Sequence, residues 1–91
     1  MRIAGVGGWV RVGYQTAATV GAWTLTRLRS QPEQAYEATA SLTSMDAFWS
    51  QQRPCTLELM VGSRAWVWAN IEPLWTAQSL TVTLTGGPVI H

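Results

Sequence analysis

The segment CTLELMVGSRAWVWANI, residues Cys55 to Ile71, carries the clearest strand pattern of the chain. Every second position from Cys55 to Val61 is apolar, which is the period of a strand with one buried face. Gly62 and Ser63 follow as a two-residue turn of the kind that joins antiparallel strands in a type I′ or II′ hairpin. The returning segment, residues 64–71, is apolar on both faces. The sequence therefore predicts a hairpin whose second strand needs cover on both sides.

The same alternation recurs on both sides of this hairpin. It predicts strands over Trp9–Tyr14, Ala17–Leu28, Tyr36–Leu42 and Leu80–Thr85, each with one apolar and one polar face or a close approximation to it. Gly21 interrupts the second of these strands, and a glycine inside a strand pattern indicates a bulge or bend. The tail, Val89 to His91, is predicted to be extended.

Residues 44–52 depart from the alternation. Thr43 or Ser44 is suited to cap a helix, and Asp46 would lie in the first turn, where a negative charge favours the helix dipole. Pro54 lacks a backbone N–H and disfavours helical geometry in the residue before it, so it would end the helix. The sequence thus predicts one short helix near residues 44–52.

The chain length of 91 residues is enough for one domain and leaves little room for a second. We predict a single β domain over residues 1–91 with extended N-terminal and C-terminal segments. Its fold class is mainly β, with about five to seven antiparallel strands arranged as a small barrel or a two-layer sandwich. Sheets of this size protect their edges by closing into a barrel or by pairing with a neighbouring chain.

Charged residues make up only 12% of the chain, and the net charge is +1. Soluble globular domains usually carry about 25% charged residues, so part of this surface is expected to be covered by another molecule. The six basic residues are all arginines, are spread along the chain and are offset by five carboxylates. Nucleic-acid-binding domains usually show a basic stripe, which is missing here.

Residues that could support catalysis are few. Cys55 is the only cysteine and lies in register with the apolar face of its strand, and His91 is the only histidine and the last residue. These two cannot form a nucleophile and base pair unless the tail is held in place. The carboxylates are scattered, and the glycines do not follow a phosphate-binding pattern. We therefore predict no enzymatic activity, no catalytic, cofactor-binding or metal site, and no cofactor.

The cysteine count and the length of the apolar runs indicate the cellular compartment. A single cysteine allows no internal disulfide, and no apolar run approaches the roughly 20 residues of a membrane helix. The sequence predicts a chain that folds in a reducing cytoplasm, without a membrane span and without a small-molecule substrate.

Six tryptophans are the remaining unusual feature. Trp23 lies on the same strand face as Leu25 and is predicted to lie in the core. The candidate interface residues are Trp49, Trp66, Trp68 and Trp75, because two lie on a strand that is apolar on both faces and two lie in or near connections. Stacking of nucleic-acid bases on Trp66 and Trp68 is an alternative use of these rings.

The stretches PCTLELMVGSRAWVWANIEPLW, residues 54–75, and SLTVTLTGGPVI, residues 79–90, resemble the small β-barrel virion proteins of tailed bacteriophages. The resemblance covers Arg53 to Ile90. It implies a structural subunit of the tail, baseplate or neck, located in the virion and assembled in the host cytoplasm. The implied partners are other virion proteins and copies of the chain itself. The alternative is a nucleic-acid-binding small β-barrel of the OB or SH3-like kind.

Overall fold

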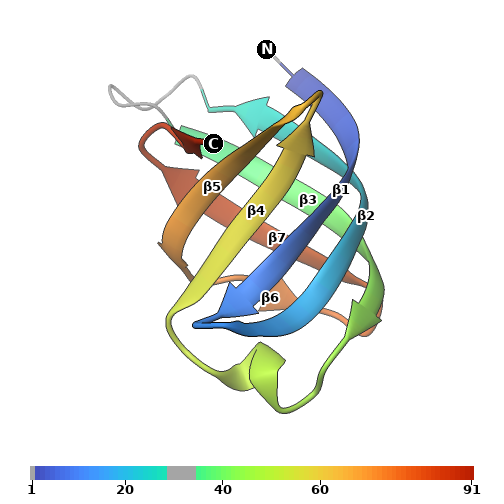
Figure 1. Cartoon of the computed structure of the whole chain (residues 1–91). Helices are drawn as coiled ribbons and strands as arrows, with labels where there is room; N and C mark the ends of the chain where they lie inside the picture. The colour runs from blue at the N-terminus through green and yellow to red at the C-terminus, as the bar shows by residue number, and fades with distance from the viewer. Residues whose placement is uncertain (1, 29–34) are drawn as a thin grey trace.

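The described part of the chain forms one antiparallel sheet of eight strands (Figure 1). The computed structural model describes residues 2–28 and 35–91. The strands are β1 Arg2–Val12, β2 Gln15–Arg27, β3 Ala35–Met45, β4 Cys55–Val61, β5 Arg64–Ile71, β6 Leu74–Trp75, β7 Ser79–Thr85 and β8 Val89–Ile90. Their order in the sheet is β6-β7-β3-β2-β1-β4-β5-β8. The predicted mainly β, antiparallel fold is confirmed.

The sheet curls strongly, so that β1, β4 and β5 lie in front of β3 and β7 in the view of Figure 1. It does not close, because no hydrogen-bonded ladder joins β5 to β7 within the described residues. The prediction of a closed barrel or of two separate sheets is therefore wrong. The predicted five to seven strands also fall short of the eight observed, because the sequence gives no period from which to recognise the two-residue strands β6 and β8.

One hydrophobic core fills the inside of the curled sheet. Its side chains alternate with exposed ones, as the period of two predicts for strands with one buried face. The buried set on β3, β4 and β7 is Ala35, Tyr36, Ala38, Ala40, Cys55, Leu57, Leu59, Leu80, Val82 and Leu84. Trp23 is buried as predicted, and its indole packs on Gly5, where a Cβ would collide with the ring.

The predicted hairpin at the centre of the sequence is confirmed. Val61 pairs with Arg64, and Gly62 adopts φ +64° while Ser63 does not enter the left-handed region, which is the type II′ pattern. The bulge predicted at Gly21 is also present, as the β2–β3 register shifts between Val20 and Trp23. These local features follow directly from glycine placement in the sequence.

A second hairpin, between β1 and β2, was not expected. Val12 pairs with Gln15, so Gly13 and Tyr14 form the turn, and Gly13 takes φ +61°. The predicted strand over Trp9–Tyr14 therefore ends two residues early. Tyr14 continues the alternating pattern in sequence but lies in the turn, where its side chain is exposed.

The short helix predicted near residues 44–52 is wrong, since the structure has only a 3-10 turn over Trp49–Gln51. β3 continues to Met45, and the hydroxyls of Thr43 and Ser44 contact the Thr19 hydroxyl at 2.6 Å each instead of capping a helix. The carboxylate of Asp46 accepts the backbone N–H groups of the third and second residues after it, at 3.0 and 2.9 Å. Because β3 ends at Met45 and the 3-10 turn covers Trp49–Gln51, too few residues remain before Pro54 for an α-helix.

Candidate interaction surface

The two edges of the sheet meet along an open seam between β5 and β7. The C-terminal segment covers the β5 edge at Ala65, Trp66 and Val67, and β6 covers the β7 edge at Leu80 and Thr81. Between these two short ladders, no ladder is present on either edge within the described chain. Backbone N–H and C=O groups on such an edge are available to pair with an added strand.

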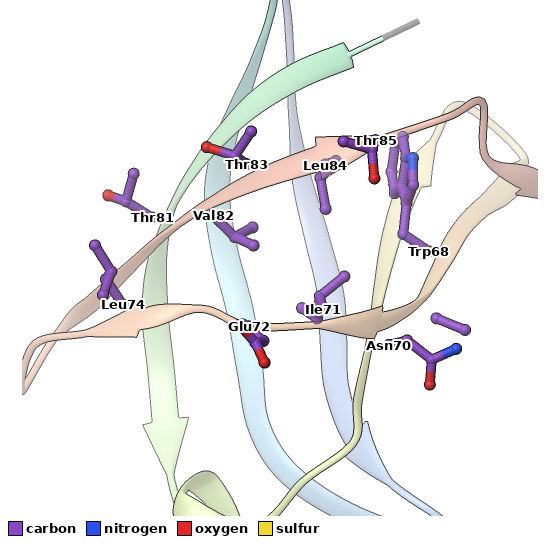
Figure 2. A pocket seen from close by; sticks show the side chains of 11 residues that line it. Trp68, Asn70, Ile71, Glu72, Leu74, Thr81, Val82, Thr83, Leu84 and Thr85 are labelled. Carbon is purple, nitrogen blue, oxygen red and sulfur yellow. The ribbon is translucent and has the colours of Figure 1, made fainter. Parts of the chain in front are cut away.

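The seam holds a cavity of about 370 Å³. Figure 2 shows Val82 and Leu84 of β7 pointing toward Ile71 of β5, with the Trp68 indole at the end of the cavity near Thr85. The other lining residues are Ala69, Asn70, Glu72, Leu74, Thr81 and Thr83. The cavity floor is therefore apolar, and the mouth is formed by polar side chains and one exposed leucine.

Local backbone geometry explains why the seam stays open. The β4–β5 register shifts between Leu57 and Cys55, so that β5 has an additional residue there, and Asn70 adopts φ +57°. A bulge bends its strand, and the left-handed conformation at Asn70 removes that residue from the extended path. Pro73 follows and has no N–H to donate to a neighbouring strand. β5 consequently turns away from β7 until β6 restores the pairing.

One side-chain hydrogen bond crosses the seam. Trp68 Nε1 donates to the carbonyl oxygen of Gly86 at 3.2 Å. The same indole contacts Tyr36 and Trp66 edge to face, with ring centroids 6.0 and 6.3 Å apart. Trp68 is only 4% exposed and belongs to the core. It fixes the distance between β5 and the segment after β7, and its ring faces are not open to a partner.

The other candidate interface residues are partly buried. Trp49, Trp66 and Trp75 pack against the core and leave only part of each ring accessible. Trp49 also contacts Phe48 edge to face, with centroids 4.9 Å apart. The four tryptophans predicted as one interface set are thus divided between core and partial surface, and the structure does not bring all four together as an exposed cluster.

Other apolar side chains are far more exposed than these tryptophans. Sequence reasoning did not select them: Val6, Tyr14, Phe48, Leu74, Val89 and Ile90. Val6 lies within β1 and pairs with Ala22, and the others lie in turns, beside turns or on edge strands. Leu74 and Val89 each follow a proline, and that spacing was the available signal that a short edge strand begins there.

The residues whose side chains could take part in catalysis or metal binding make structural contacts instead. The Cys55 thiol is buried, as predicted, and donates to the Gln52 carbonyl oxygen at 3.0 Å. Arg11 lies over the Trp9 ring at 5.3 Å and 3.6 Å from the carboxylate of Glu58. Across residues 2–28 and 35–91, no cluster of three or more histidine, cysteine, aspartate or glutamate side chains is placed to hold a metal ion.

His91 pairs with β5 through its backbone. The backbone of His91 exchanges two hydrogen bonds with Ala65, at 2.9 and 3.3 Å, while its side chain is exposed.

Within the described ranges, no helix has the length and apolar character needed to cross a membrane. No family model matches the chain, and neither the curated proteins nor the solved structures contain a significant match.

Proposed function

We propose that the chain is a non-enzymatic structural subunit of a bacteriophage particle, in its tail, baseplate or neck. It acts by contacting other virion proteins and copies of itself through sheet edges and exposed apolar side chains. The observation that carries the structural role is the exposure of Phe48 at 63%, Leu74 at 75% and Val89 at 61% on a chain with few charges. The assignment to a virion rests on the resemblance of residues 53–90.

The free energy available from such a contact is of the same order as the cost of association. Burying one large apolar side chain contributes about 1.5–3 kcal/mol. Association costs roughly 4–15 kcal/mol in lost translational and rotational freedom. Phe48, Leu74, Val89 and Ile90 are four such side chains, so a subunit that buries all of them offsets a large part of this cost. The charge-poor surface adds little electrostatic repulsion between copies.

Nucleic-acid binding by base stacking has less support from the same geometry. The Trp68 ring is buried, and Trp66 contacts it edge to face, so these two residues do not present a platform of open ring faces. Arg11, on the outer face of β1, is engaged by Trp9 and Glu58. The proposed structural role, in contrast, depends on side chains that are exposed, such as Phe48, Leu74 and Val89.

Light scattering over a range of protein concentrations tests the proposal. We expect the molar mass to rise above the 10.0 kDa of one chain, and we expect Phe48→Ser combined with Leu74→Ser to lower the mass at each concentration. Thr39→Ser is the matched control, since Thr39 is an exposed residue of β3 outside the apolar set. A mass of one chain at the highest concentration would overturn the proposal.

A further inference from the structure

β8 is one of two strands of two residues that cover the edges of the sheet, and its ladder is short. It pairs with β5 at two positions, Trp66 with Ile90 and Val67 with Val89, and the exchange between Ala65 and the backbone of residue 91 extends the ladder by one pair. Val89 and Ile90 are 61% and 48% exposed, so their side chains add little buried area. Segments with few buried contacts and short ladders open at low free-energy cost.

The connection that precedes β8 is built as a hinge. Gly86 takes φ +80°, a conformation that glycine adopts without steric cost, and its carbonyl is held by Trp68 Nε1. Only Gly87 and Pro88 separate this fixed point from Val89. Pro88 has its φ fixed by the ring, so a rotation about φ or ψ of Gly87, or ψ of Pro88, moves β8 while β7 stays in the sheet.

We propose that β8 exchanges between copies of this chain, so that the segment 87–91 of one molecule pairs with the β5 edge of the next. This inference deepens the proposed structural role, on which it rests, by naming the strand and the edge involved. The occupant is a second copy because the β5 edge already accepts this segment, in register, within one chain. The same contacts are available to the same segment from a neighbour.

The open seam favours the exchange. When β8 leaves, the β5 edge is free from Arg64 to Ile71, because residues 68–71 have no ladder on that side in the described chain. Five extended residues span about 16 Å, so the β5 edge of the neighbour must lie within that distance of Gly86. Each chain then donates one strand and accepts one, which is a head-to-tail contact that closes into a ring or continues as a filament.

Trapping by disulfides tests the exchange directly. Val67 and Val89 are cross-strand partners, and the Cα separation of such a pair, about 4.5–5.5 Å, suits a disulfide. A Val67→Cys variant is mixed with a Val89→Cys variant at high concentration under slow oxidation. We expect a disulfide-linked heterodimer, enriched several-fold over the mixture of Val67→Cys with Thr39→Cys, and a linked peptide that joins positions 67 and 89 by mass spectrometry.

Two further variants make the outcome decisive. The double variant Val67→Cys/Val89→Cys, at low concentration, is expected to form the intramolecular disulfide, which verifies folding and the position of β8. Deleting Gly87 shortens the hinge so that β8 no longer reaches its own β5, and the protein is expected to shift toward oligomers by light scattering. Self-association of the parent chain without the 67–89 heterodimer would overturn the exchange and leave the proposed function standing. An absent intramolecular disulfide would also overturn it.

Discussion

Trp68→Phe is the substitution that tests how the seam is held. The indole is 4% exposed, donates its N–H to Gly86 at 3.2 Å and contacts Tyr36. Loss of this hydrogen bond costs about 1 kcal/mol, and a core cavity of a few atoms costs about another 1–2 kcal/mol. We therefore expect the free energy of unfolding to fall by roughly 2–3 kcal/mol. For a domain of this size, each 1 kcal/mol lowers Tm by about 4–8 °C.

The assay is urea denaturation followed by tryptophan fluorescence, with the thermal transition measured by circular dichroism. Trp66→Phe is the matched control, because Trp66 is the same residue type on the same strand, is partly exposed and makes no side-chain hydrogen bond in the described structure. Its loss in stability is expected to be under 1 kcal/mol. Equal losses for the two variants would refute the assignment of Trp68 to the core and to the seam.

Three further substitutions test local geometry by the same denaturation assay. Gly5→Ala is expected to cost about 1–3 kcal/mol, since the added Cβ collides with the Trp23 indole, and an unchanged midpoint would contradict that packing. Asn70→Gly is expected to stabilise by about 0.5–1 kcal/mol, because glycine adopts φ +57° without strain, and a loss would contradict the left-handed backbone. Asp46→Ala is expected to cost about 1 kcal/mol through loss of the acceptor for Phe48 N–H, whereas Asp46→Asn should keep most of it.

Strands whose alternation is unbroken were predictable from the sequence. In β4 from Cys55 to Met60 and throughout β7, every second residue is buried and apolar and each intervening residue is more exposed, so period two and glycine turns define both the strand and its inner face. Gly62 and Gly21 marked a turn and a bulge for the same reason. These signals are local, and local backbone preferences are enough to produce them.

The features that depend on distant partners were not predictable. Thr43 and Ser44 have the composition of a helix cap, but both hydroxyls reach Thr19 on another strand, and this contact keeps β3 extended. Trp66 and Trp68 were predicted together as interface residues of one strand, yet Trp68 is buried against Tyr36 and Trp66 is only partly buried. Which ring becomes core depends on how the sheet curls, and no window of the sequence contains that information.

The open seam links the fold to assembly. A sheet with two free edges is prone to uncontrolled pairing, and proteins limit this with very short edge strands. β6 and β8 are two residues each and cover only one end of the β7 and β5 edges. Gly86 is held by Trp68, whereas φ and ψ of Gly87 and ψ of Pro88 can change, so β8 can leave its edge without disturbing the core. In the proposed exchange, the segment that covers the β5 edge of the isolated chain is also the segment that joins it to a neighbour, so assembly by this route would depend on local concentration.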